Sequence, residues 1–359
     1  MKLKNLLLAL VCLATLSGCD MMKEDVDDTY CGLFVNFKYD YNLQRADMFK
    51  DHVGGVTLYV FDSNGGFVRT YEANNIPQMG TLLYDGTYAY CMHITDLPDG
   101  NYRFIALANQ RPYTETLGTP GAKYRRSDLQ PGNSMESLSV TLDRSGGVVS
   151  NVAPMDTLWH GMSSGQPVVV NNHGYCVTTI PLVRDTKMLT IGLHHLDEDK
   201  RLKISADDFD FVIRDRNGRI AYDNAVVEEE TLVYTPFHTW DTQTLDEQGS
   251  AVDRTAHASL TFNRLMLHDS IGEDAILTIT NREDGKEVAR INLPEFLSQG
   301  RNAIDTYRYG PQEYLDRGYD FYMDFFLKGG EWHEIELSVG VGLHILSWAR
   351  RIQRVDIEQ

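Results

Sequence analysis

The sequence has few positive charges and no strong cluster of them. Lys and Arg number 33 against 51 Asp and Glu, and the formal net charge at pH 7 is −18. Proteins that bind nucleic acid or an anionic lipid surface need a basic patch. The densest basic group, at 350–354, is followed at once by Asp356 and Glu358. We therefore expect no nucleic-acid partner.

The sequence also lacks the motifs of several common catalytic and cofactor-binding sites. It has no HExxH, no phosphate-binding loop and no Cys–His pair at a recognisable spacing. His194 and His195 are neighbours at the end of an expected strand, where consecutive side chains point to opposite faces. His160 and His173 have no carboxylate or thiol at a fixed spacing. We therefore expect a protein that is not an enzyme and that holds no metal.

Long hydrophobic runs are missing after the first residues, and the run at the start is short. Lys2 and Lys4 precede an apolar stretch at 6–14, which falls short of the roughly 20 residues that span a bilayer. Small residues then lead to Cys19 in the sequence Leu-Ser-Gly-Cys. This order predicts a lipoprotein signal peptide at 1–18 and a covalent lipid on Cys19, with no other cofactor. An ordinary secretory signal that happens to contain a cysteine is the alternative.

The segment after the lipid site, 19–30, is acidic and predicts a flexible tether. Lys23, Glu24 and Asp25 resemble the signal that marks lipoproteins of some Gram-negative groups for the outer leaflet. The expected location is the cell outer membrane, with the lipid as anchor and the protein exposed at the surface. A spacer with no sorting role is the alternative.

Cysteine is scarce in the rest of the chain. Apart from Cys12 and Cys19, only Cys31, Cys91 and Cys176 are present, and no CxxC occurs. Three is an odd number, so at most one disulfide forms. We expect small buried side chains on which the fold does not depend.

Short strands with turn residues between them run through the rest of the chain. Segments 56–61 and 67–71 alternate in polarity around an Asn-Gly turn and predict a hairpin. Further strands are expected at 33–37, 101–108, 175–182, 188–193, 209–214, 258–265, 275–280, 319–327 and 332–339. Alternating βα units are absent. The sequence therefore predicts a mainly β fold of β-sandwich domains with a few short helices.

Several segments resemble the fimbrillin-associated anchor lipoproteins of type V pili. The resemblance lies in 37–42, in 56–65, in Leu97-Pro98-Asp99-Gly100-Asn101-Tyr102, in 158–161, in 181–184 and in 313–327. Each motif is loose, and their order together with the lipid site is the specific part.

This resemblance implies two tandem transthyretin-like β-sandwich domains, at 31–184 and 185–359. It also implies neighbouring fimbrial subunits as partners, joined by donor-strand β-augmentation. Ordinary pilins open a groove when a protease removes their N-terminal strand. A lipid-anchored subunit should instead keep its first strand at 33–37 and donate a C-terminal strand. Arg45 follows that strand, and we expect it to be exposed and not to be cleaved.

The expected donor strand covers 343–357. Its candidate contact residues are the apolar side chains of Leu343, Ile345, Trp348, Ile352, Val355 and Ile357. The main alternative function is a surface glycan-binding lipoprotein, which needs an exposed Trp or Tyr platform. The identity of the pilus, and the choice between a base anchor and an adhesive tip, stay open.

Overall fold

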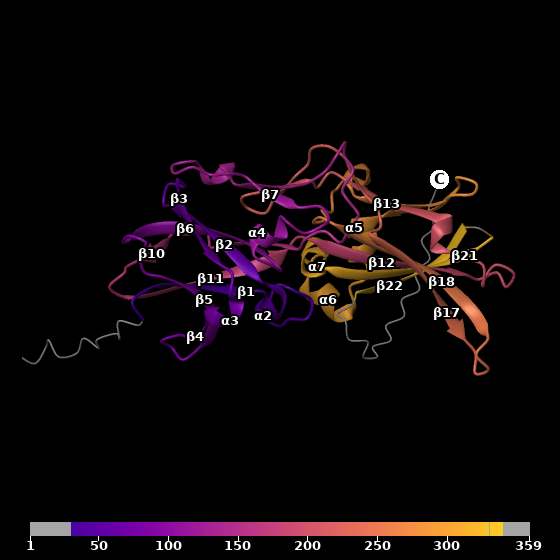
Figure 1. The fold of residues 1–359 in the computed structure, drawn as a ribbon, viewed down its shortest axis with the longest axis horizontal. Coiled ribbons are helices and arrows are strands. Elements are labelled where there is room, and N and C mark those ends of the chain that lie inside the picture. The colour runs from indigo at the N-terminus through magenta and orange to yellow at the C-terminus, as the bar shows by residue number, and fades with distance from the viewer. Residues whose placement is uncertain (1–29, 330, 340–359) are drawn as a thin grey trace, which may run out of the picture.

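The computed structural model describes residues 30–329 and 331–339. The molecule is elongated in Figure 1, with the first half of the chain at one end and the second half at the other. Strands dominate and the helices are short, so the predicted mainly β fold is confirmed. None of the helices in these residues is long and apolar enough to cross a membrane.

The first half of the chain forms a nine-stranded mixed sheet. Its strands are β1 (Gly32–Lys38), β2 (Gly55–Asp62), β3 (Phe67–Ala73), β4 (Gly80–Leu82), β5 (Tyr88–Ile94), β6 (Gly100–Asn109), β9 (Leu158–Met162), β10 (Val168–Val170) and β11 (Tyr175–Arg184). Their order is β3-β2-β6-β9-β11-β1-β5-β4, and β10 pairs with β6. The sheet encloses a core made by alternate residues of its strands.

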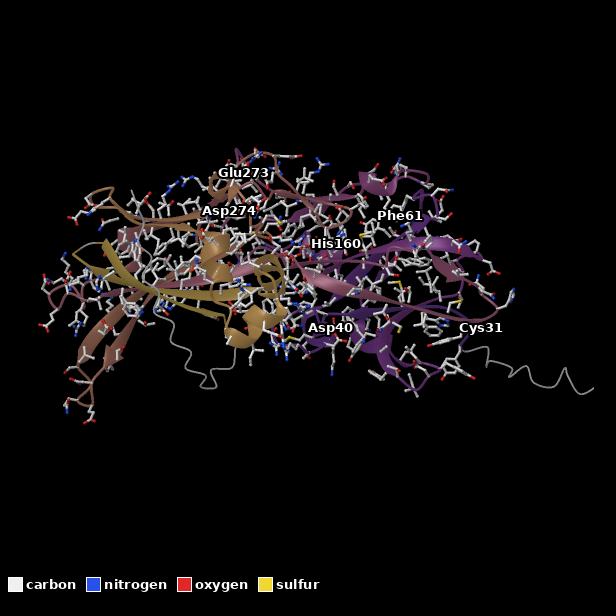
Figure 2. The ribbon with its side chains drawn as sticks, turned by 180° about the vertical axis from the view of Figure 1, so that it is seen from behind. Cys31, Asp40, Phe61, His160, Glu273 and Asp274 are labelled. Atoms are coloured by element: carbon white, nitrogen blue, oxygen red, sulfur yellow. The ribbon has the colours of Figure 1, made fainter. Side chains whose placement is uncertain are left out.

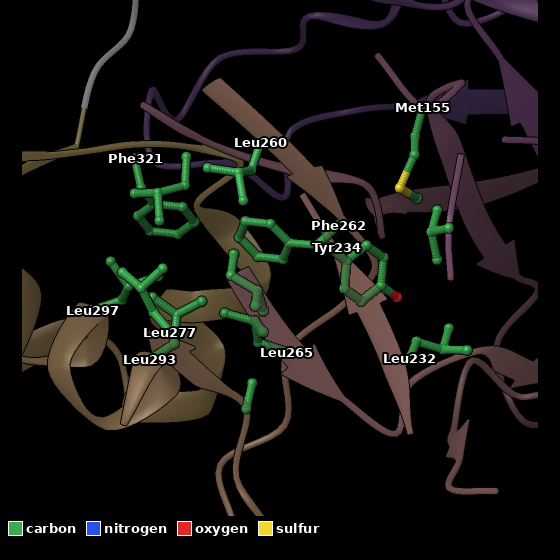
Figure 3. Packing of buried hydrophobic residues seen from close by; sticks show 14 of the residues in the cluster. Met155, Leu232, Tyr234, Leu260, Phe262, Leu265, Leu277, Leu293, Leu297 and Phe321 are labelled. Atoms are coloured by element: carbon green, nitrogen blue, oxygen red, sulfur yellow. The ribbon is translucent and has the colours of Figure 1, made fainter. Parts of the chain in front are cut away.

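The second half is a sandwich of two sheets. Its strands are β12 (Lys187–His195), β13 (Phe209–Asp215), β16 (Leu232–Tyr234), β17 (His238–Leu245), β18 (Ala251–Phe262), β19 (Ile276–Asn281), β20 (Glu287–Asn292), β21 (Asp320–Lys328) and β22 (Glu331–Val339). One sheet has the order β17-β18-β12-β21-β22 and the other β16-β13-β19-β20. Figure 3 shows apolar side chains filling the space between them, with Phe262 beside Tyr234. The packing is that of a β-sandwich.

A fourth sheet, of four strands, joins the two halves. It consists of β7 (Tyr124–Arg126), β8 (Ser139–Leu142), β14 (Arg219–Ala221) and β15 (Val226–Val227). β8 from the first half pairs with β14 from the second, with Val140 opposite Ile220. The larger core also crosses between the halves, since Phe61 and Leu158 belong to the same buried cluster as Phe262. The predicted division at residue 184 falls between β11 and β12, where the chain changes sheets, and it stays a prediction.

The helices are single turns or little more. They are α2 (Phe49–His52), α3 (Ile76–Met79), α4 (Tyr113–Thr116), α5 (Leu293–Ser298), α6 (Ala303–Arg308) and α7 (Pro311–Arg317), with 3-10 turns η2 (Met135–Ser137), η3 (Ala206–Asp208) and η4 (Ile271–Glu273). Asn292 and Asn302 start α5 and α6, because each side chain accepts backbone N–H groups of the first turn.

Most of the predicted strands are present near their predicted positions. The hairpin of β2 and β3 turns through Gly65, whose φ of 86° is the positive value that the Asn-Gly pair predicted. β5 and β9 were missed, because β5 follows a turn-rich segment and β9 contains His160 and Gly161 among its five residues. The transthyretin-like topology stays a prediction.

Candidate functional site

The first strand is built into the interior of the nine-stranded sheet. β1 pairs with β5 in antiparallel and with β11 in parallel orientation. Leu33, Val35 and Phe37 point into the core and are fully buried, while Phe34 packs on the opposite face. Each such side chain contributes about 1.5–3 kcal/mol by its burial. Removing β1 would therefore break two ladders and open the core of the first half.

The loop after β1 is fastened to the second half. Arg45 has a φ of 58°, in the left-handed region that non-glycine residues rarely adopt. Its Nη2 atom lies 2.9 Å from Oδ1 of Asp305, and its Nε donates to the Tyr309 hydroxyl at 3.2 Å. Arg45 is exposed, as predicted, and it also forms an ion pair with Asp305 of α6.

Arginines and aromatic rings stack where the two halves meet, in a region called the junction below. The Arg184 guanidinium lies 4.2 Å from the centre of the Tyr319 ring and 5.6 Å from that of Trp159. Tyr39, one residue beyond β1, contacts the edge of Trp159. Burial raises the pKa of Tyr39, so its hydroxyl stays protonated. The junction thereby connects the end of β1 to the start of β21.

Charged side chains are buried beside this stack. Lys187 Nζ donates to the backbone carbonyls of Arg184, Asp316 and Gly318 at 2.8–2.9 Å. Arg264 forms two hydrogen bonds of 2.7 Å with the Asp316 carboxylate. Burial lowers the pKa of Lys187 and raises the pKa of the Asp185 carboxyl. Three carbonyl acceptors favour the charged ammonium of Lys187. Its hydrogen bond to the Asp316 carbonyl links the start of β12 to α7.

Sequence reasoning missed these junction residues as a group. The available indication was four consecutive polar residues, Arg184-Asp185-Thr186-Lys187, at the predicted boundary between the halves. A linker of that composition is expected in solvent. Here Asp185, Thr186 and Lys187 are all buried.

A spacing that resembles a catalytic motif was also overlooked. Residues 161–165 read Gly-Met-Ser-Ser-Gly, which matches the G-x-S-x-G of a nucleophile elbow. Ser163, however, follows β9 and leads to β10 with no helix after it. Its hydroxyl accepts a hydrogen bond from Phe104 N at 3.1 Å, and within the described ranges no hydrogen bond links it to a histidine. The segment lacks the geometry of a catalytic serine.

The histidines that were considered as ligands have other partners. His160 Nε2 lies 2.8 Å from the Tyr222 carbonyl, so it also links the two halves. Figure 2 shows His160 near the middle of the molecule. His194 lies 3.3 Å from Asp324 Oδ1, and His195 lies 3.5 Å from Asp197 Oδ2. The part of the chain that the structure describes contains no group of three or more His, Cys, Asp or Glu placed to hold a metal ion.

Cys31, Cys91 and Cys176 are all free thiols. Cys91 is buried, and burial raises the pKa of its thiol to about 12. The optional disulfide is therefore not formed.

Two surface hollows have mixed linings. One of about 590 Å³ is lined by charged residues including Lys200, Lys203 and Asp207 above apolar Phe209 and Leu327. The other, of about 610 Å³, lies along β3 and contains the Arg126 guanidinium stacked 3.8 Å from the centre of the Tyr113 ring. Arg126 donates to Thr57 Oγ1 at 2.6 Å. The stacking of Arg126 on Tyr113 and its hydrogen bond to Thr57 are contacts that support the structure of the hollow.

An open tryptophan platform is missing from the described residues. Trp159 is fully buried and Trp332 packs partly against the core. Trp240 is stacked between His238 and His257, at 4.9 and 4.8 Å between ring centres. A sugar needs a free ring face, and both faces of Trp240 are covered.

The remaining predicted site residues lie outside the described residues. They are the lipid site Cys19, the export-signal residues Lys23, Glu24 and Asp25, and the donor-strand residues Leu343, Ile345, Trp348, Ile352, Val355 and Ile357. These assignments stay predictions.

Comparison with protein families gives one match over most of the chain. Residues 26–353 match the family described as fimbrillin-A associated anchor proteins Mfa1 and Mfa2. No curated protein matches the sequence.

Several solved structures are similar to this chain. A proposed adhesin from Bacteroides thetaiotaomicron is 27% identical, covers 86% of this chain and 96% of its own, and gives a TM-score of 0.68. A proposed polysaccharide-binding protein from the same organism is 28% identical, with coverage of 86% and 95% and a TM-score of 0.64. The fimbrial anchor protein Mfa2 from Porphyromonas gingivalis is 17% identical, covers 86% of this chain and 97% of its own, and gives a TM-score of 0.55, which shows a shared fold.

Proposed function

Since the chain belongs to the family of the fimbrillin-A associated anchor proteins Mfa1 and Mfa2, we propose that it is a non-catalytic anchor or accessory subunit of a fimbria. In this proposal a lipid on Cys19 holds the amino end at the outer membrane. The carboxyl end joins a neighbouring subunit by donating a strand. No cofactor other than the lipid takes part.

The interior position of β1 is the observation that carries this proposal. A subunit that accepts a donor strand needs an empty place in its sheet. β1 fills the place between β5 and β11, and Arg45 ties the loop behind it to α6. A subunit held in this way ends a chain of donor strands, because it has no groove to offer while β1 stays.

The lipid follows from the sequence around Cys19 and from the retained first strand. A protein anchored at its amino end cannot lose that end and stay on the membrane. Several acyl chains on one cysteine hold far better than one, because each buried methylene contributes about 0.8 kcal/mol. Retention of β1 and lipidation of Cys19 therefore support the same role.

The donor strand is proposed for 343–357, beyond the end of β22. β22 pairs with β21 at one edge of the five-stranded sheet. Leu343 and Ile345 have the spacing of side chains on one face of a strand. Main-chain hydrogen bonds supply affinity in β-augmentation, and alternate side chains fill pockets of the partner.

Two variants test the proposal in cells that make the fimbria. Cys19→Ala removes the lipid site, and deletion of 343–359 removes the donor strand. We expect both to release fibres into the medium or to change fibre length, measured by electron microscopy and by immunoblot of cells and medium. Mass spectrometry of the mature wild-type protein should find an acylated Cys19 at its amino end.

Matched controls exist for both variants. Cys31→Ala changes a nearby cysteine that carries no predicted lipid, and Ser347→Ala changes a residue within the donor segment that is absent from the predicted apolar set. Both should retain fibres as the wild type does. Full retention of fibres in Cys19→Ala and in the deletion variant would contradict the proposal.

A surface glycan-binding role is the second candidate. It is favoured by the similarity to the proposed polysaccharide-binding protein, which is 28% identical. The covered faces of Trp240 speak against a stacking platform there. Calorimetry with the glycans of the surrounding cell surface is the test: micromolar binding that Trp240→Ala abolishes would favour this role.

A further inference from the structure

We propose that the end of the first half beside Tyr30 rests on the lipid surface, with a group of tyrosine rings at the level of the headgroups. The proposal rests on the lipid anchor proposed above. It adds a second contact with the membrane, made by the folded protein itself.

The patch consists of aromatic and apolar side chains beside Phe34, on the outer face of β1 and β11. The ring of Tyr84 lies 5.7 Å from that of Tyr30 and 5.8 Å from that of Tyr175. Tyr84 and Val177 are each about half exposed. Leu82 and Tyr88 of the β4–β5 hairpin are also exposed, at 58% and 62%, but they point to the opposite face of the sheet, because Tyr88 precedes the outward-facing Ala89 and pairs with Leu82. Tyr30, Tyr84, Tyr175 and Val177 are called the tyrosine patch below.

The three segments that contain the patch are nearly free of charge. Residues 30–37, 80–94 and 167–183 contain a single Asp, Glu, Lys or Arg, which is Asp85. At the 23% charged residues of the whole chain, these segments would contain about nine. Contiguous exposed apolar surface with few charges marks an interaction site. The strands beneath the patch therefore carry little charge, whereas the adjoining loop at 95–99 carries Asp96 and Asp99, and Asp99 accepts a hydrogen bond from Asn172 N at 2.9 Å.

The proposed lipid anchor at Cys19 indicates that the tyrosine patch faces a membrane. Ten residues separate Cys19 from Tyr30, so the two lie at most about 38 Å apart and about 18 Å apart for a flexible chain. Figure 2 shows Cys31 near one end of the molecule. With Cys19 in the membrane, the tyrosine patch is the folded surface next to Tyr30 that reaches the lipid.

Tyrosine is the side chain that suits this position. Its ring is apolar and its hydroxyl is polar, so it is enriched where hydrocarbon meets water. The patch has no basic residue, and the tether before it is acidic. A zwitterionic lipid surface therefore fits, whereas an anionic one would be repelled.

Hydroxyl-radical footprinting read by peptide mass spectrometry tests the proposal. Acylated wild-type protein on phosphatidylcholine vesicles is compared with Cys19→Ala protein in solution. Tyr30, Tyr84 and Tyr175 should be oxidised about threefold more slowly on the vesicles, because rings among headgroups meet less water. Tyr307 of α6, which is 94% exposed in the second half, is the internal control and should react equally in both samples.

The outcomes separate this proposal from the anchor proposal. Wild-type protein that carries no acyl chain and does not float with the vesicles contradicts the anchor. Protein that floats while Tyr84 and Tyr175 react as they do in solution overturns the tyrosine patch and leaves the anchor intact. Val177→Asp, at an exposed position, should fold and should restore oxidation of Tyr84 and Tyr175 on vesicles.

Discussion

The two ends of the described chain are held in different ways. β1, near the amino end, hydrogen-bonds a strand on each side. β22, near the carboxyl end, pairs with β21 alone within residues 30–329 and 331–339. A strand with two neighbours leaves only when two ladders break, whereas an edge strand offers unpaired N–H and C=O groups to another chain. Within residues 30–329 and 331–339, β1 is therefore an interior strand and β22 an edge strand, which is the arrangement that the proposed anchor needs.

The largest effect is expected in β1 itself. Phe37→Ala removes a fully buried ring from the core of the first half. We expect the free energy of unfolding to fall by about 3–5 kcal/mol in chemical denaturation, through lost burial and the cavity left behind. Val177→Ala, at a half-exposed position on neighbouring β11, should change it by less than about 0.5 kcal/mol. Equal small losses in both variants would mean that β1 is not part of the core.

The next effect concerns the junction that binds the two halves together. Lys187→Met keeps the length of the side chain but removes its charge and three hydrogen bonds to carbonyls. Denaturation should show a loss of about 3 kcal/mol, because buried partners are left unpaired. Adding Asp185→Asn should cost less than the sum of the single changes, since Lys187 and Asp185 interact. If Lys187→Met leaves the free energy of unfolding unchanged, the hydrogen bonds of Lys187 do not hold the two halves together.

Another effect is expected from pH, with opposite signs at two positions. Burial raises the pKa of Asp215 to about 7 and lowers the pKa of His160 to about 4. Unfolded, the groups titrate near about 3.9 and 6.5. The contribution of Asp215 to the free energy of unfolding is therefore lost as pH rises from about 4 to 7. The contribution of His160 is lost as pH falls from about 6.5 to 4.

Each of these pH dependences can be removed separately. Denaturation curves between pH 4 and 8 should show that Asp215→Asn abolishes the loss at rising pH, and that His160→Gln abolishes the loss at falling pH. Across its own pH range, each of these changes in the free energy of unfolding should amount to about 3–4 kcal/mol in total. Each variant serves as the control for the other. If neither variant changes the pH dependence of the wild-type protein, both assignments are contradicted.

The smallest effect is expected at the loop behind β1. Asp305→Asn breaks the ion pair of Arg45 and should leave overall stability nearly unchanged. Limited proteolysis with trypsin should then cut after Arg45 several-fold faster, because a protease needs the loop extended and the arginine free. Asp210→Asn breaks an exposed pair with Arg282 at the other end of the molecule and should not alter this cleavage. Unchanged cleavage in Asp305→Asn would show that the pair does not hold the loop.

Local pattern predicted the strands but not the contacts between the halves. The β2–β3 hairpin was predictable because the Asn-Gly turn and the alternating residues lie within twenty positions of each other. The pairing of β8 with β14 joins residues about eighty positions apart, and no local pattern records it. For the same reason the exposure of Arg45 could be predicted but its contacts could not, because its partners Asp305 and Tyr309 lie more than 250 positions away.

The sequence by itself determined the mainly β fold and the excess of acidic over basic residues, because these depend on composition and on short-range order, and the lipid at Cys19 stays a prediction. Only the tertiary structure decided that β1 is an interior strand, that Lys187 is buried between the halves and that Trp240 has no free face. Those properties depend on which distant segments pack together. A polar residue is buried, or an aromatic ring covered, only by neighbours that the chain brings from elsewhere.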